Sequence, residues 1–244
     1  MALNVATLKT RSLTAVVFVA VMLTGLLWNF WSFLILFTIV HFGCWYELMK
    51  LLKKIYGEKY LNYCFFGLIY ITMPIAMLFH LYVNINFSES VPGGSYFFEI
   101  PELGTFYSNI LPCAIIFSIW INDTMAYIVG SLIGKTPFSK ISPKKTWEGT
   151  IGGALLCVVV IGLLGYFIPI AKVIAVKHWI IIAALCAIFG TIGDLFESKL
   201  KRMANVKDSG AIMPGHGGFL DRFDSLLFAA PAVWVYVKLF MQYL

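Results

Sequence analysis

Charged side chains are scarce in this sequence. Only 12% of its 244 residues are Asp, Glu, Lys or Arg, whereas about a quarter of the residues of an ordinary soluble domain are charged. Hydrophobic residues make up 60%, and the mean hydropathy is +0.86. So little charge cannot cover the surface of a water-soluble globule, and this excludes a soluble enzyme, a disordered protein and a nucleic-acid-binding domain despite the net charge of +6. We therefore expect an all-α polytopic membrane protein.

Two motifs are also missing. The five cysteines stand singly in apolar runs without a CxxC pair, which argues against a zinc site and favours small buried side chains. An apolar stretch from Leu13 to Leu27 follows Lys9 and Arg11, but no small-x-small cleavage pattern comes after it. We expect this stretch to be a retained first span and not a cleaved signal peptide.

Long apolar runs are abundant. A span needs about 20 largely apolar residues, and seven runs meet this length: about 12–28, 29–49, 61–85, 108–132, 149–170, 178–198 and 219–243. The first two form one apolar run too long for a single crossing, and Trp28-Asn29-Phe30-Trp31 within it predicts an interfacial hairpin turn. The segment 86–107 contains Pro, Gly, Ser and acidic residues but no Lys or Arg, and we expect it to be a loop outside the membrane.

Basic residues predict the orientation of these spans. Fifteen of the eighteen Lys and Arg residues fall on one side, and only Lys172, Lys177 and Lys238 fall on the other. The positive-inside rule places the first side in the cytoplasm, with the N-terminus inside and the C-terminus outside. The chain also divides by character into N-terminal spans with a loop (1–107) and a region with polar, glycine-rich loops (108–244), where we expect the chemistry.

Four carboxylates lie within or beside predicted spans: Asp123, Asp194, Asp221 and Asp224. Such groups are costly near a bilayer and are functional candidates by default. All four point toward the cytoplasmic half, and Asp221 and Asp224 are three residues apart on one helical face. Hard carboxylate oxygens suit Mg²⁺. The alternative is an interfacial cluster in which Asp221 and Asp224 pair with Arg222 and nearby lysines, and the residues alone leave both open.

The segment 196–225 combines basic residues with a glycine-rich loop. Gly217 and Gly218 could present backbone N–H groups to a phosphate, although the basic residues alone could be membrane anchors. His216 is either a metal ligand or a hydrogen-bonding loop residue. Glu197 and Lys201 are four residues apart and predict a pair on the helix surface.

A second loop, residues 134–149, is predicted to lie on the same side. Lys144 and Lys145 could bind phosphate, and the Trp147 ring could stack on a base. The alternative is an interfacial Trp with snorkelling lysines. The glycines that follow, Gly149, Gly152 and Gly153, favour close helix packing.

Several segments together resemble the phosphatidate cytidylyltransferase family, also called CDP-diacylglycerol synthases. They are NDTMAY (122–127), SPKKTWEG (142–149), GDLFES (193–198), and the run Ser198-x-x-Lys201-Arg202, Lys207-Asp208, Gly210, Pro214-x-His216-Gly217-Gly218, Asp221-Arg222-x-Asp224. The resemblance covers about 120–228. The chain departs from the family at Met213, a conservative change, and at Ser131, which replaces a basic residue often found there.

The resemblance implies transfer of CMP from CTP to phosphatidic acid, which yields CDP-diacylglycerol and pyrophosphate. It also implies a helical membrane fold that can have more than seven spans, Mg²⁺ with a second metal ion left open, a homodimer, and a bacterial inner-membrane location with the site facing the cytoplasm. The implied metal ligands are Asp194, Asp221, Asp224 and Asp123. The implied catalytic residues are Asp194, Asp221, Asp224, Lys201, Arg202, Lys207 and Arg222. The implied substrate contacts are Ser142, Lys144, Lys145, Thr146, Trp147, Ser198, His216, Gly217 and Gly218.

Two other activities compete with this one. A CTP-dependent polyprenol or lipid kinase would move a γ-phosphoryl group, and composition does not separate it from a cytidylyltransferase. A transporter would place its charges near the bilayer midplane, commonly in repeated halves, but here the charges crowd one border and no repeat is visible. A CDP-alcohol phosphotransferase is disfavoured because its DG-x-x-AR motif is absent.

Overall fold

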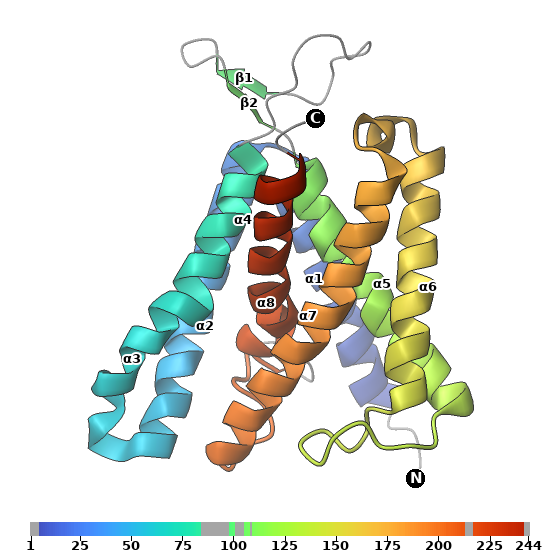
Figure 1. Cartoon of the computed structure of the whole chain (residues 1–244). Helices are drawn as coiled ribbons and strands as arrows, with labels where there is room; N and C mark the ends of the chain where they lie inside the picture. Colours follow the sequence, from blue (N-terminus) through green and yellow to red (C-terminus); the bar gives the residue numbers. More distant parts are fainter. Residues whose placement is uncertain (1–4, 84–97, 101–104, 108, 213–216, 242–244) are drawn as a thin grey trace.

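The chain forms a bundle of long helices with one short two-stranded sheet (Figure 1). The computed structural model describes residues 5–83, 98–100, 105–107, 109–212 and 217–241. The helices are α1 (Val5–Leu27), α2 (Phe30–Tyr56), η1 (Gly57–Tyr60), α3 (Leu61–Gly67), η2 (Leu68–Thr72), α4 (Met73–Val83), α5 (Ile110–Ile133), α6 (Trp147–Phe167), η3 (Pro169–Val173), α7 (Val176–Met203), α8 (Leu220–Tyr236) and η4 (Val237–Met241). Strands β1 (Phe98–Ile100) and β2 (Thr105–Tyr107) pair antiparallel. The predicted helical fold class is confirmed, with this small hairpin added.

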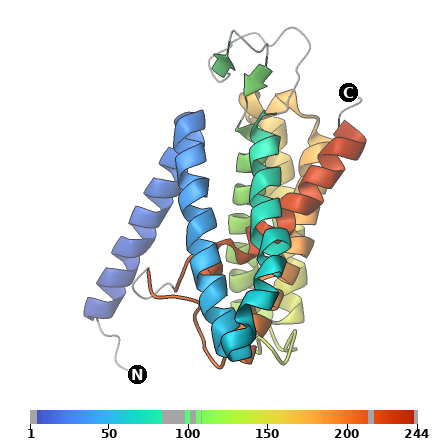
Figure 2. The same ribbon diagram turned by 90° about the vertical axis from the view of Figure 1, so that its left-hand side faces the viewer.

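Helices α1 and α2 form the first helical hairpin, which Figure 2 shows from the side. Asn29 caps α2 by accepting a hydrogen bond from the Ser32 N–H (2.8 Å), and the Ser32 hydroxyl accepts one from the Asn29 N–H (3.1 Å). This reciprocal capping box satisfies two N–H groups that the first turn of a helix leaves open. The Ser32 hydroxyl also donates to the Gly25 carbonyl of α1 (3.2 Å). The predicted turn is therefore confirmed at Trp28 and Asn29, whereas Phe30 and Trp31 already belong to α2.

The helical stretch Phe30–Tyr82 folds back on itself. Gly57 has a φ of +57°, a left-handed conformation that glycine adopts without a Cβ clash, and the chain reverses there. The rings of Phe33 and Phe79, one from each arm, lie 5.6 Å apart edge to face. Helices α2 and α4 are therefore antiparallel neighbours (Figure 1).

Among the residues that the structure describes, five helical stretches are long and apolar enough to cross a membrane: Phe30–Tyr82, Ile110–Ile133, Trp147–Phe167, Val176–Met203 and Leu220–Met241. A shorter apolar helix covers Leu13–Leu27. The prediction of a membrane protein with several spanning helices is confirmed. The count of seven spans stays a prediction.

Helices α5 and α6 approach closely because glycines line their contact. A Cβ on Gly149 would lie 2.8 Å from the carbonyl oxygen of Ala126, and a Cβ on Gly153 would lie 2.6 Å from the Ala126 Cα. A Cβ on Gly152 would lie 2.6 Å from Cγ1 of Val129. These small residues let two backbones touch, as membrane helix pairs commonly do. The predicted packing role of the three glycines is confirmed.

Replacing Gly153 with Val is expected to destabilise the protein by about 3 kcal/mol, at the upper end of the usual cost of overpacking. The clash is with backbone atoms of Ala126, which cannot rotate away. Thermal unfolding in detergent measures the change. Gly162→Ala is the control, because its Cβ would lie 3.2 Å from the flexible Ile180 side chain. Equal unfolding temperatures for the two variants would contradict the packing argument.

The contact between α7 and α8 brings charged helix ends together. A Cβ on Gly193 would lie 3.2 Å from the Ser225 Cα, and one on Gly190 would lie 3.4 Å from the Ser225 Cβ. Asp194 of α7 therefore lies beside the first turns of α8. The α2–α3 turn, the 134–146 loop and the start of α8 all lie toward the lower end in Figure 1, opposite β1 and β2. Which end faces the cytoplasm stays a prediction.

Candidate active site

The C-terminal end of α7 reverses the chain. Asn205 is left-handed, with a φ of +53°. The Val206 N–H donates to the Lys201 carbonyl (2.9 Å), and the Asn205 N–H donates to the Arg202 carbonyl (3.1 Å). These two bonds form a Schellman motif, a common way to end a helix and satisfy its last carbonyls. The following segment thus returns toward α7 and brings the start of α8 beside Lys201.

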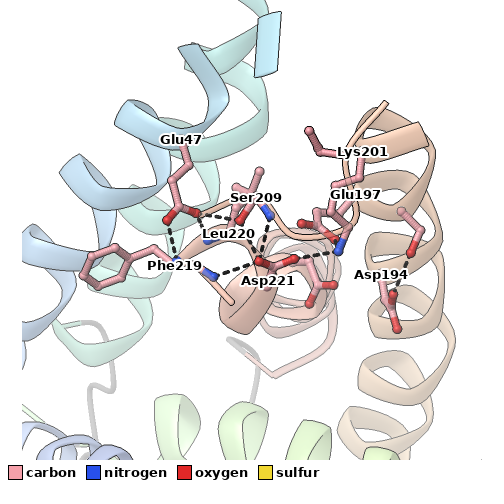
Figure 3. A network of polar contacts seen from close by, with 12 residues as sticks. Glu47, Asp194, Glu197, Lys201, Ser209, Phe219, Leu220 and Asp221 are labelled. Atoms are coloured by element: carbon pink, nitrogen blue, oxygen red, sulfur yellow. Dashed lines mark hydrogen bonds and ion pairs between the residues drawn. The ribbon is translucent and has the colours of Figure 1, made fainter. Parts of the chain in front are cut away.

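Glu47 of α2 caps the start of α8 from a different part of the chain. Its carboxylate accepts hydrogen bonds from the N–H groups of Phe219 (3.0 Å) and Leu220 (2.8 Å) and from the Ser209 hydroxyl (2.7 Å) (Figure 3). Only 1% of Glu47 is exposed. The first N–H groups of a helix lack intrahelical partners and carry partial positive charge, so a carboxylate there is stabilising.

Asp221, in the first turn of α8, accepts several hydrogen bonds. Its donors are the Lys201 Nζ (2.6 Å), the Ser209 N–H (2.9 Å) and the Gly218 N–H (2.8 Å), and the Ser209 hydroxyl, whose one proton is shared with Glu47, lies 2.8 Å away (Figure 3). Gly217, with a φ of +84°, passes so close that a Cβ there would lie 2.5 Å from the Asp221 carboxylate. The glycine-rich turn therefore wraps around Asp221.

Lys201 joins Asp221 to a second buried carboxylate. Its ammonium group forms ion pairs with Glu197, one turn earlier on α7, and with Asp221. The exposed fractions of the three side chains are 12%, 0% and 7% for Lys201, Glu197 and Asp221. The prediction of a Glu197–Lys201 pair is correct, but its placement on the helix surface is wrong, since both side chains are largely buried and Asp221 of α8 lies against Lys201. We call Glu47, Glu197, Lys201, Ser209 and Asp221 the carboxylate network.

A second polar group adjoins this network and is here called the Asp194 group: Asp123, Lys145, Asp194 and Asp224. Lys145 forms an ion pair with Asp194, which also accepts a hydrogen bond from the Ser198 hydroxyl (3.3 Å). Asp224 interacts electrostatically with Asp194 and Asp123, and Glu197 interacts with both Asp224 and Asp221. Carboxylates from α5, α7 and α8 therefore meet in one region.

The 134–147 loop is held in a defined shape and brings Lys145 to this region. The Phe138 N–H donates to the Lys145 carbonyl (2.7 Å), and the Trp147 N–H donates to the Thr136 carbonyl (3.0 Å). Glu148 accepts from the Thr136 N–H (3.1 Å), and Thr146 caps α6 by accepting from the Gly149 N–H (3.2 Å). Trp147 packs edge to face on Phe138 and remains 48% exposed.

The structure brings most of the sequence-predicted residues to one end of the bundle. The carboxylate network and its turn contain Asp221, Lys201, Gly217 and Gly218, and the Asp194 group and its contacts contain Asp194, Asp224, Asp123, Lys145 and Ser198. Ser142, Thr146 and Trp147 belong to the adjoining loop, and Lys144, Arg202, Lys207 and Arg222 are exposed. His216 lies outside the described residues.

Carboxylates of this chain compete with phosphate for the backbone N–H groups of the glycine-rich segment. The N–H groups of Gly218, Phe219 and Leu220 already donate to the carboxylates of Asp221 and Glu47. Substrate phosphate would have to displace these carboxylates to use the same donors. The cations at this end, Lys145 among them, are therefore better candidates for phosphate contacts.

Carboxylate oxygens are the donors that Mg²⁺ prefers, so the chemistry of the Asp194 group and Asp221 fits this ion. In the part of the chain that the structure describes, no three His, Cys, Asp or Glu side chains already form a metal-binding arrangement. Instead, Asp194 forms an ion pair with Lys145, and Asp221 forms one with Lys201. The predicted metal ligands thus stay predictions.

Glu47 and Ser209 are the residues that the sequence analysis missed. Glu47 precedes Lys50, Lys53 and Lys54, so it could be taken for part of a charged helix end at the membrane border. The available signal was a carboxylate directly after an apolar run, the same criterion that identified Asp194. Ser209 carries no signal of its own.

Comparison with known proteins gives a consistent result. The model of the cytidylyltransferase family matches residues 102–240. A phosphatidate cytidylyltransferase from Aquifex aeolicus is 40% identical over 141 residues, 57% of this chain and 50% of the relative. One from Synechocystis is 46% identical over 133 residues (52% and 42%), and one from Bacillus subtilis is 42% identical over 147 residues (59% and 53%).

The chain spans about half the length of the curated relatives it matches. The family match includes α5 to α8, and with them both polar groups except Glu47. Because this match covers more than half of the chain, the chain belongs to the cytidylyltransferase family.

Proposed function

We propose that this protein transfers CMP from CTP to phosphatidic acid and forms CDP-diacylglycerol and pyrophosphate. A phosphate oxygen of the lipid attacks the α-phosphorus of CTP. The bond from that phosphorus to the oxygen bridging to the β-phosphate breaks, and pyrophosphate leaves with the bonding electrons. The observation that carries the proposal is the 40–46% identity to relatives named for this activity, in a chain whose family match includes the Asp194 group.

An apolar groove supports a lipid as one of the substrates. It has a volume of about 1120 Å³ and lies between the α2–α4 hairpin and helices α7 and α8. Leu48 and Leu200 line it, and they directly follow Glu47 and precede Lys201 of the carboxylate network. Acyl chains in this groove would place a lipid phosphate near the charged end of the bundle.

The charges of the site suit the transfer of a charged phosphoryl group. A lipid phosphate is already ionised at neutral pH, so the reaction depends on positioning and charge neutralisation more than on a strong base. Lys145 and the exposed Lys144, Arg202, Lys207 and Arg222 are the proposed phosphate contacts. Asp123, Asp194, Asp221 and Asp224 are the proposed ligands of Mg²⁺, which when bound neutralises charge on the phosphates.

The location of the site follows from the substrates. The protein is an integral membrane protein by its spanning helices, and we propose that the lower end in Figure 1 faces the cytoplasm, where CTP is found. A bacterial inner membrane and a homodimeric state are parts of the same proposal. The bacterial relatives support the former.

A labelling experiment tests the activity. Purified protein in lipid nanodiscs is incubated with phosphatidic acid, Mg²⁺ and CTP carrying ³²P at either the α or the γ position. Label from the α position in the lipid product supports the proposal. Label from the γ position would indicate a kinase, and label from neither position would contradict transfer of any kind.

A further inference from the structure

Glu47 is a buried carboxylate that lies far along the sequence from the residues that resemble the family. It lies in α2, before the matched region that begins at residue 102, and it is 1% exposed. A buried carboxylate is expensive unless its oxygens are bonded. Lys145 and Lys201 form ion pairs with Asp194, Glu197 and Asp221 and not with Glu47. Glu47 is balanced by hydrogen-bond donors of the 209–220 segment instead.

Two of these donors, the N–H groups of Phe219 and Leu220, lie at the N-terminus of α8, which is the positive end of its helix dipole. The N-terminus of a helix is a general anion site because its N–H groups converge there. At α8 the anion is Glu47 itself, which holds Phe219 at 3.0 Å and Leu220 at 2.8 Å. The carboxylate thus fixes where α8 begins.

Two signature glycines are explained by the same carboxylate. A Cβ on Gly210 would lie 2.7 Å from the Glu47 Cδ, and a Cβ on Gly218 would overlap the Glu47 carboxylate. Any side chain at these positions would push Glu47 out of its place. The absence of side chains at Gly210 and Gly218 therefore leaves the space that the Glu47 carboxylate occupies.

Ser209 transmits the position of Glu47 to Asp221. Its hydroxyl lies 2.7 Å from Oε2 of Glu47 and 2.8 Å from Oδ2 of Asp221, and its backbone N–H donates to the same Asp221 oxygen at 2.9 Å. The hydroxyl lies between the two carboxylates, as Figure 3 shows. Movement of Glu47 would therefore release the segment that orients Asp221.

We propose that Glu47 is a positioning residue for the reaction, which holds Ser209 and the start of α8 so that Asp221 faces the reacting phosphates. Helix α2 is then part of the catalytic unit, although it lies outside the family match. The role in the reaction rests on the proposed function, whereas the ordering of the segment does not.

Hydrogen exchange measured by mass spectrometry tests the ordering without any substrate. Glu47→Gln keeps the size of the side chain but replaces one accepting oxygen by an NH₂ group, which faces N–H and O–H donors. Exchange in peptides covering Ser209 and Gly218–Leu220 should accelerate about 10- to 100-fold, the range expected for lost bonds to a charged group, with α5 and α6 unchanged. Glu58→Gln, at an exposed position on the same hairpin, should exchange like the parent protein.

Kinetics tests the link to the reaction. In Glu47→Gln, kcat should fall about 10- to 100-fold, as for other residues that orient a ligand-binding side chain, while KM for CTP changes far less. Gly210→Ala should reproduce both effects, because its Cβ displaces the Glu47 carboxylate. It provides a second variant if Glu47→Gln does not fold.

The exchange and kinetic results test the ordering role and the positioning role of Glu47 separately. Parent-like exchange at Ser209 and Gly218–Leu220 in both variants would overturn the ordering role, and so would loss of protection throughout the bundle. Faster local exchange with unchanged kcat would overturn the positioning role. If the parent protein transfers no CMP but the local exchange still accelerates, the proposed function fails and the ordering of the segment by Glu47 stands.

Discussion

Replacing Asp221 with Asn is expected to reduce CMP transfer about 10²- to 10³-fold, the loss typical of removing one preorganised electrostatic contact from an active site. The carboxylate accepts from Lys201 and from the N–H groups of Ser209 and Gly218, and the Ser209 hydroxyl lies between it and Glu47. An amide retains only one accepting oxygen and brings an NH₂ group against these donors. It also removes the negative charge that would hold Mg²⁺. The rate is measured with α-labelled CTP in nanodiscs.

Asp208→Asn is the matched control for this variant. Asp208 lies in the same segment but is exposed, so its variant should retain the parent rate. Both proteins should appear in the membrane fraction in equal amounts, since neither substitution removes an apolar residue from a spanning stretch. Near-normal turnover of Asp221→Asn would contradict the assignment of Asp221 to metal binding and catalysis.

Hydropathy predicted the apolar part of each long helix, where lipid contact is expected, but not where the helix ends. The predicted span 178–198 falls inside α7, which runs from Val176 to Met203. The apolar part is found correctly, but the helix continues through polar residues to the Schellman motif at Asn205. A hydropathy window records where lipid surrounds a helix, whereas capping sets where the helix ends.

The site was predictable where a single residue is costly by itself. Asp194 and Asp221 were identified because carboxylates at membrane helix ends need a reason to be there. The contact of Glu47 with Leu220 joins residues 173 positions apart, and no periodicity or spacing encodes such a pairing. Glu197 was misplaced for the same reason, since its burial depends on a segment that returns from elsewhere in the chain.

Replacing Lys201 with Met is expected to destabilise the protein by about 3–5 kcal/mol, the usual cost of removing one partner from a buried ion pair. Lys201 is the cation paired with both Glu197 and Asp221, whose side chains are 0% and 7% exposed. Methionine fills much of the same volume but leaves two buried carboxylates without that charge. Thermal unfolding in detergent measures the loss. Lys199→Met is the control, because Lys199 lies two residues earlier on α7 and is exposed; it should change stability by about 0.5 kcal/mol or less.

A double-mutant cycle separates charge balance from lost packing. Glu197→Gln combined with Lys201→Met removes one of the two carboxylates that the single variant leaves uncompensated, so the double variant should be more stable than Lys201→Met alone. The interaction free energy of the cycle should fall in the range of about 0.5–3 kcal/mol found for contacting residues. If the effects of the two substitutions simply add, packing of the lysine stem would account for the loss. A favourable coupling would instead mean that the charge of Lys201 stabilises Glu197 in its buried position, at the end of α7 where Lys201 also pairs with Asp221 of α8.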